Sequence, residues 1–270
     1  MLKQRGYNFF GNLAVVNFHR GTSKSEKQKF ALNLIKKNKS VKTVLEKSEQ
    51  FKGRLRKMKT AWLAGEKTKE VLYKENNCTF RFNIDETYFS PRLSNERKEI
   101  ASYIKKGQEV LVMFAGVAPF PIVIAKNSQA KIIYSNELNK TANKYAELNI
   151  KLNHVEKKVV LIPGDIKKVA EKIKKGWKIN PTFLPLFSNS RSSFDFPRVN
   201  SRHPFKNIVP KTFDIIIMPR PQLKDSFLDS AFKLSKKGTE IYYYDFCSEG
   251  NKKSHQTTPD HPPQNYANFS

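Results

Sequence analysis

EVLVMFAGVAPFPIVIAK, residues 109–126, carries the strongest local pattern of this chain. After Glu109 it begins with an uninterrupted apolar run, typical of a strand buried on both faces of a parallel sheet. A turn containing Gly116 and two prolines follows, and residues 121–126 predict a short helix. In an open α/β sheet, ligands bind at the carboxyl ends of the strands, and a glycine there lets the backbone approach a nucleoside closely. The alternative is a tight turn without a ligand.

Strands and helices alternate after this segment, which is the signature of a parallel sheet with helical crossovers. Further strands are predicted at residues 131–134, 158–162, 213–218 and 240–246, and further helices at 141–152 and 225–234. We expect Gly238 to cap the last helix. The pattern predicts an α/β fold in which a Rossmann-like domain occupies residues 87–250, with a long insertion at about 178–211 and a flexible tail at 251–270.

Acidic residues follow two of these strands. Glu137 comes just after the strand at 131–134, where a carboxylate can accept hydrogen bonds from both hydroxyls of a ribose. Asp165 follows the strand at 158–162, where it can accept from the exocyclic amine of an adenine. No G-x-G-x-x-G motif is present, which argues against a dinucleotide site. The Gly116 turn followed by these two acids is the general pattern of class I methyltransferases.

The first 86 residues predict a small basic α+β domain that binds RNA. Strands are expected at residues 12–18, 41–45 and 78–84, with an amphipathic helix at 24–38. A stretch between the last two strands is dense in Arg54, Arg56, Lys57 and Lys59. A solvated charged face explains that stretch as well as an RNA contact does.

The charge balance indicates a polyanionic partner. The chain has 50 Lys and Arg against 24 Asp and Glu, with a net charge of +26 and a pI of about 10.0. A domain pI above about 9 is typical of nucleic-acid binding, although a ribosome-associated protein or a lysine-rich lineage would look the same. Two cysteines exclude a disulfide framework, and five scattered histidines argue against a metal site. Without a signal peptide or an apolar run that spans a bilayer, a cytoplasmic protein is expected.

The block YFSPRLSNER, residues 88–97, precedes the predicted sheet. It predicts the start of a helix that Ser94 caps, with Arg97 on the turn beside Glu96. An ordinary surface helix with an exposed ion pair is the alternative interpretation.

Five segments resemble the archaeal and eukaryotic tRNA guanine-37 N1-methyltransferase family. They are FFGNLAVVNF, LAGEKTKEVLYKENNCTFRFNIDETYFSPRLSNER, VLVMFAGVAPFPIVIAK, SNELN with NIKLN, and IIIMPRP, spread over residues 9–221. The resemblance implies that the small basic domain is fused to a catalytic class I methyltransferase domain. It also implies S-adenosyl-L-methionine as the methyl donor and the anticodon region of tRNA as the partner. We expect the enzyme to be a monomer.

The resemblance also implies roles for individual residues. A glutamate matching Glu96 is the general base, and an arginine matching Arg56 assists at the guanine. Donor-site residues are expected at Arg97, Phe114, Glu137, Asp165 and Ile166, and at Pro219 of the family's fourth-strand motif, to which the local pattern adds Gly116. The chemistry agrees, because guanine N1 carries a proton and its methylation needs a base within hydrogen-bond reach. A fixed guanidinium stabilises the negative charge that then builds toward O6.

Three features depart from the family pattern. Ala118 stands where glycine is usual, and Pro219 stands where many members have asparagine. The chain also starts too late to hold the additional N-terminal domain that most members carry. The Pro219 variation resembles an archaeal branch that also methylates C7 of 4-demethylwyosine at the same nucleotide. A second hypothesis is an RNA-binding protein whose methyltransferase fold is degenerate.

Overall fold

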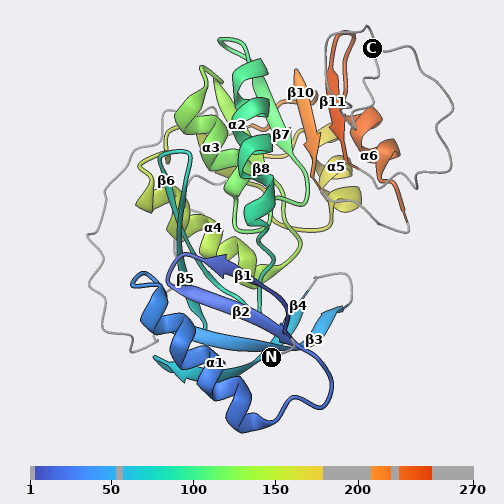
Figure 1. Cartoon of the computed structure of the whole chain (residues 1–270). Coiled ribbons are helices and arrows are strands. Elements are labelled where there is room, and N and C mark those ends of the chain that lie inside the picture. The colour runs from blue at the N-terminus through green and yellow to red at the C-terminus, as the bar shows by residue number, and fades with distance from the viewer. Residues whose placement is uncertain (1–3, 53–56, 179–207, 220–224, 245–270) are drawn as a thin grey trace, which may run out of the picture.

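A computed structural model describes residues 4–52, 57–178, 208–219 and 225–244 (Figure 1). A small sheet with one helix, at the bottom of that view, precedes a larger part built around a parallel sheet. Most of the predicted insertion, the predicted tail and Arg56 lie outside the described residues. No described helix is long and apolar enough to cross a membrane.

The larger part contains the predicted parallel sheet. Its strands lie in the order β11-β10-β7-β8-β9, and each neighbouring pair is parallel. Their bounds are β7 (Glu109–Val112), β8 (Ile132–Ser135), β9 (Val159–Leu161), β10 (Ile215–Met218) and β11 (Glu240–Tyr243). The chain runs outward from β7 through β8 to β9 and then returns to β10 on the other side of β7. The strand order therefore reverses at β7, where such sheets bind their ligands.

Helices cover both faces of this sheet. The core on one face includes residues of α2 (Ser94–Tyr103), α3 (Pro119–Asn127) and α4 (Lys140–Leu152). The core on the other face includes residues of α5 (Ile166–Lys174) and α6 (Leu228–Lys233). This doubly wound arrangement confirms the predicted Rossmann-like fold.

Two helix predictions on the second face need correction. Helix α5 was not predicted, although its buried residues Ile166, Val169, Ala170 and Ile173 follow helical spacing. The helix predicted at 225–234 is shorter in the structure, because α6 begins after Phe227 and ends at Lys233, with Leu234 as its C-cap. Gly238 therefore lies in a later turn, with φ of 82°, and does not cap the helix.

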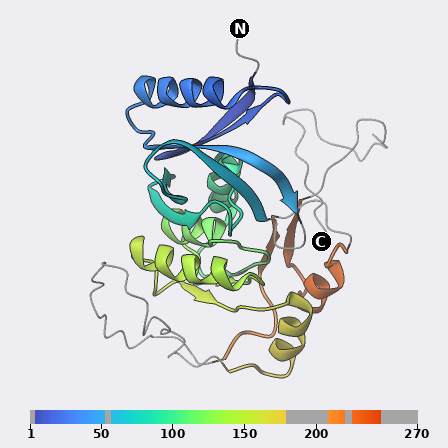
Figure 2. The same cartoon turned by 90° about the horizontal axis from the view of Figure 1, so that it is seen from below.

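The small part is a four-stranded sheet in the order β1-β2-β3-β4. It comprises β1 (Gln4–Phe10), β2 (Leu13–Phe18), α1 (Lys24–Lys37), β3 (Thr43–Lys52) and β4 (Lys57–Gly65). Helix α1 starts with a capping box between Ser23 and Glu26 and covers the face of the sheet that points away from the larger part (Figure 2). The predicted helix and the strand predicted at 12–18 are confirmed. The strand predicted at 41–45 begins at Thr43 and runs to Lys52, and β1 and β4 were not predicted.

The part of the basic stretch that the structure describes, Lys57 to Lys59, lies in strand β4. Met58 and Thr60 are buried while Lys57 and Lys59 are exposed, as expected for alternating positions of a strand. At these two lysines the basic stretch is the exposed, charged face of a strand.

A hairpin of β5 (Glu70–Glu75) and β6 (Cys78–Asn83) links the two parts. Its turn residues Asn76 and Asn77 have φ of 46° and 59°, which asparagine tolerates better than most residues. The apolar face of β6 joins the core that contains α2, α3 and α4. The hairpin precedes residue 86, the predicted domain boundary, yet it packs against α4 and contributes to the core of the larger part.

Candidate active site

The loop after β7 is held in an unusual backbone conformation. Phe114, Gly116 and Ala118 all have positive φ, at 56°, 58° and 65°. Ala118 is fully buried and directly precedes α3. Glycine suits such a position because an L-residue there costs roughly 1–2 kcal/mol, a cost that the alanine of this chain carries. The loop is tied to the end of β8, because the backbone N–H of Ala115 donates to the Asn136 carbonyl at 2.8 Å.

Glu137 lies just after β8 and is fixed by two backbone donors. Its Oε2 accepts from the N–H of Gly116 at 2.8 Å, and its Oε1 accepts from the N–H of Asn139 at 2.7 Å. The side chain is half-buried, and within the described part of the chain no cation pairs with it. Each oxygen keeps a lone pair beyond the one already used. Glu137 therefore presents a negative charge at the end of the sheet that neutral donors hold in place.

The loops after β8 and β9 are joined through Asn136, which is 1% exposed. Its Nδ2 donates to the carbonyls of Ile162 at 2.8 Å and Gly164 at 3.1 Å. Asp165 then caps α5, where its Oδ1 accepts from the N–H of Lys167 at 3.0 Å. These contacts bring Asp165 and Glu137 to neighbouring loops, as the order of strands and acids predicted.

Three further residues predicted around the donor, Ile166, Phe114 and Pro219, lie on the same end of the sheet. Ile166 is buried at the start of α5, and Phe114 packs edge to face on Phe227 with centroids 5.2 Å apart. Pro219 directly follows β10, the strand beside β7. We call the ends of β7, β8, β9 and β10 with these loops the strand-end edge.

The segment that leads into α2 runs along the strand-end edge. The Nδ2 of Asn139 donates to the Glu86 carbonyl at 2.9 Å. A Cβ added at Gly116 would lie 3.3 Å from the Tyr88 carbonyl oxygen, so glycine gives this approach its room. The structure therefore brings the YFSPRLSNER block, which precedes the sheet in sequence, against the loops predicted to bind the donor.

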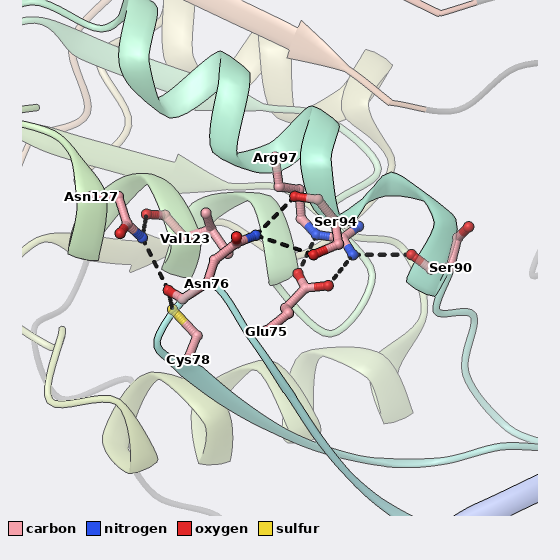
Figure 3. Close-up of polar contacts among 8 residues, drawn as sticks. All are labelled: Glu75, Asn76, Cys78, Ser90, Ser94, Arg97, Val123 and Asn127. Atoms are coloured by element: carbon pink, nitrogen blue, oxygen red, sulfur yellow. Dashed lines mark hydrogen bonds and ion pairs between the residues drawn. The ribbon is translucent and has the colours of Figure 1, made fainter. Parts of the chain in front are cut away.

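Helix α2 begins differently from the prediction. Its N-cap is Leu93, and Ser94 is the first helical residue and makes no capping bond. Instead the Nδ2 of Asn76, at the hairpin turn, donates to the Ser94 carbonyl at 2.8 Å (Figure 3). A short 3-10 helix, η1 (Pro91–Leu93), precedes α2 and leaves Ser94 inside the helical run. The expected Ser94 cap is therefore wrong.

Arg97 points into the interior. Its side chain is 1% exposed and forms a two-bond ion pair with Glu75 of the hairpin, with Nη2 2.6 Å from Oε2 (Figure 3). Nη2 also donates to the Ser90 carbonyl at 3.0 Å, and the guanidinium lies over the rings of Phe89 and Phe120. The alternative of an exposed ion pair on a surface helix is therefore wrong for Arg97. Its predicted contact with the donor remains a prediction.

Glu96, the residue before Arg97 on α2, points in a different direction. It is half-buried, and its Oε1 accepts from the hydroxyl of Tyr244 at 2.7 Å. Tyr244 comes directly after β11 and was not singled out from the sequence. The aromatic run of the last strand, EIYYYDF at residues 240–246, was the available signal, but it does not indicate a partner 148 residues away.

Two kinds of chemistry, metal binding and nucleophilic attack by a cysteine, find no support among the described residues. No group of three or more His, Cys, Asp or Glu side chains that could hold a metal lies among them. Cys78 is 1% exposed in the hairpin, and burial raises the pKa of its thiol to about 11. It is a packing residue, as expected, and not a nucleophile.

Much of this candidate site lies in a segment that matches a known protein family. Residues 71–180 match the TRM5/TYW2 methyltransferase domain. A Nanoarchaeum equitans protein named tRNA (guanine(37)-N(1))/4-demethylwyosine(37)-methyltransferase Taw22 is 32% identical over 257 residues, which are 90% of this chain and 84% of that protein. This chain belongs to the TRM5/TYW2 methyltransferase family. The Trm5b protein of Pyrococcus abyssi, named a tRNA (guanine(37)-N(1))-methyltransferase, is 29% identical over 90% of this chain and 61% of its own length.

Solved structures of the TRM5/TYW2 family have the same fold. The crystal structure of Pyrococcus abyssi Trm5b matches 92% of this chain with a TM-score of 0.68 and 29% identity. A complex of aTrm5 with tRNALeu matches 90% with a TM-score of 0.68 and 25% identity. This chain covers 62% and 60% of those two chains, so it spans less than two thirds of their length.

Proposed function

We propose that this chain transfers a methyl group from S-adenosyl-L-methionine to N1 of guanosine 37 in tRNA. The observation that carries the proposal is the course of the segment before α2. Its hydrogen bond with Asn139 and its close approach to Gly116 bring the Glu96 block to the edge that holds Glu137. A base and a nucleoside site on one edge are what methylation of a protonated ring nitrogen requires. The names of relatives from Nanoarchaeum and Pyrococcus support the same reaction.

The strand-end edge fits the donor. Glu137 is held by neutral N–H groups and keeps its charge for the two ribose hydroxyls. Asp165, Ile166, Phe114 and Pro219 surround the same end of the sheet, where the adenine and the methionine part would lie. The donor supplies a methyl group that its sulfonium sulfur already activates. Among relatives, a Methanocaldococcus jannaschii Trm5 structure contains adenosine.

Glu96 would act as the base. It takes the proton from N1 of guanine, the freed nitrogen lone pair forms the bond to the methyl carbon, and the carbon–sulfur electron pair stays on sulfur. The negative charge that develops toward O6 needs a cation, for which we propose Arg56. Arg56 lies outside the described residues, so this role rests on the family resemblance alone.

The partner is tRNA, bound near its anticodon. A net charge of +26 favours a polyanion, and the solved relative with tRNALeu supports the choice. The hypothesis of an RNA-binding protein with a degenerate fold receives less support, because buried Ala118 is accommodated and the loop around it keeps its hydrogen bonds. We also propose that the enzyme acts in the cytosol and as a monomer.

A second activity, C7-methylation of 4-demethylwyosine, is favoured by one observation. The relative from Nanoarchaeum equitans carries both activities in its name, and the match covers 84% of its length. The Pro219 variation resembles the same archaeal branch.

Nucleoside mass spectrometry tests both reactions. The protein is incubated with S-adenosyl-L-methionine and a tRNA transcript that carries guanosine at position 37, and the digested RNA is searched for 1-methylguanosine. A transcript with adenosine at that position serves as the control. A second RNA carrying 4-demethylwyosine tests C7-methylation. Product in the first reaction and none in the control is expected, whereas no methylated product from any RNA would overturn the proposal.

A further inference from the structure

Glu96 and Arg97, neighbours on α2, are bound by different partners. Arg97 pairs with Glu75 of the hairpin, whereas Glu96 is bound by Tyr244, directly after β11. The hydroxyl of Tyr244 donates to Glu96 Oε1 at 2.7 Å. The two residues are 148 positions apart in the chain, so the contact exists only in the folded sheet. It joins the residue proposed as the base to the edge strand of the parallel sheet.

The ring of Tyr244 is itself held in place. It packs edge to face on Phe120 of α3, with centroids 6.1 Å apart and planes at 70°. Phe120 is 3% exposed and belongs to the core shared by α2, α3 and α4. Because the ring rests on a buried side chain, the hydroxyl is presented to Glu96 from a fixed point.

Strand alternation explains why this tyrosine faces α2. Tyr242 and Tyr244 pack against the core on the α2 side of the sheet, while Tyr243 packs against the core on the other side. Tyr242 stacks on Tyr103 at the last residue of α2, with centroids 6.3 Å apart and planes at 11°. The strand therefore supports α2 at both ends, by a ring contact at its last residue and by a hydrogen bond in its first turn.

A glutamate that acts as a base needs such a partner. The last torsion of a glutamate side chain is broad, so its carboxylate plane is poorly fixed by rotamer preference alone. A base must lie within hydrogen-bond reach of the proton that it removes, and a displacement of about 1 Å can cost up to about a hundredfold in rate. A hydrogen bond to one oxygen fixes the plane and thereby the direction of the other oxygen.

Resting on the proposed function, we propose that Tyr244 is a positioning residue for N1-methylation, whose hydroxyl holds the Glu96 carboxylate in the orientation that accepts the N1 proton. Tyr244 does not need to touch the guanine or the donor, and it neither gains nor loses a proton in the reaction.

Tyr244→Phe tests this role because it removes the hydroxyl and keeps the ring on Phe120. Single-turnover methylation of a guanosine-37 transcript is measured at saturating protein and donor, together with the Kd of both ligands and the Tm. We expect the rate to fall about ten- to a hundredfold, with Kd and Tm near the wild-type values. Tyr103→Phe is the matched control, because it removes a phenol–carboxylate hydrogen bond to Glu99 on the same helix. Its rate should stay at the wild-type level.

A double variant distinguishes positioning from general support of the fold. If Tyr244 acts through Glu96, then adding Tyr244→Phe to Glu96→Gln should lower the rate little further, since the two residues share one interaction. A wild-type rate in Tyr244→Phe, or the same fold loss on both backgrounds, overturns the inference while the proposed function stands. A wild-type protein that forms no 1-methylguanosine overturns the proposed function, and the inference with it.

Discussion

Glu75 and Glu137 are two fixed carboxylates of this fold with opposite surroundings. Glu75 belongs to the hairpin contact, by which we mean Glu75, Asn76, Ser90, Ser94 and Arg97 (Figure 3). Its side chain is 3% exposed, and both oxygens accept from the guanidinium of Arg97. Glu137, on the strand-end edge, is half-buried and accepts from two neutral backbone N–H groups. The first charge is neutralised by a cation within the protein, while the second is held only by neutral donors, as the proposed donor site requires.

Helix α2 connects these two regions. Arg97 faces the hairpin contact, and Glu96 faces Tyr244 beyond the end of β11. Adjacent helical positions point in different directions, so one turn of helix can serve stability on one side and chemistry on the other. Substitutions on the two sides should therefore have separate effects: those in the hairpin contact should lower the free energy of unfolding, and those on the edge should lower activity.

The largest effect on stability is expected at Glu75. Glu75→Gln keeps the size of the side chain but leaves the buried guanidinium of Arg97 without a counter-charge. Breaking a buried ion pair in this way costs about 3–5 kcal/mol of unfolding free energy, measured by urea denaturation. Glu147→Gln is the control, since its pair with Lys151 is on the surface of α4 and should contribute under about 1 kcal/mol. Equal losses in the two variants would remove the distinction between the regions.

Glu137→Ala tests the other region. The ribose hydroxyls would lose a charged acceptor, so affinity for S-adenosyl-L-methionine should weaken by about 1.5–3 kcal/mol. Isothermal titration measures this loss, and a thermal melt shows whether the loop has lost its order. An unchanged donor affinity in a folded variant would mean that Glu137 holds the Gly116 loop by its hydrogen bond and does not bind the donor.

The smallest effect is expected at the hairpin turn. Asn76→Gly keeps a residue that tolerates positive φ but removes the amide that donates to Ser94. Asn77→Gly is a matched control, because Asn77 has a similar φ of 59° and an exposed side chain. The difference between the two variants in unfolding free energy should be about 1 kcal/mol. If the two variants are equally stable, the amide of Asn76 does not hold α2.

The sequence predicts the sheet well because its signals are local. The buried strand at β7, the acids at Glu137 and Asp165 and the helices α3 and α4 follow from the hydrophobic period and from the chemistry of strand ends. Helix α5 could have been predicted from the sequence, since its apolar residues have helical spacing. The predicted start of helix α6 at Asp225 is three residues too early, and Gly238 was wrongly expected to cap a helix that ends at Lys233.

The partners of Arg97 and Glu96 could not be predicted from the sequence, and the reason is physical. Arg97 and Glu96 are neighbours in sequence, which suggests a pair, but their partners Glu75 and Tyr244 come from a hairpin and from the last strand. Such pairings depend on tertiary packing, which leaves no local period. The approach of Tyr88 to Gly116 is of the same kind, because only the folded chain shows what the glycine makes room for.

The rate of Glu96→Gln in a single turnover tests the central claim most directly. The substitution keeps the size of the side chain and its bonding to Tyr244 but removes the basicity. With a guanosine-37 tRNA and saturating donor, we predict that methylation slows at least about a hundredfold, while the Kd values for tRNA and donor and the Tm stay near those of the wild type. A rate close to the wild type, or a loss confined to binding or to Tm, would contradict the assignment of Glu96 as the base.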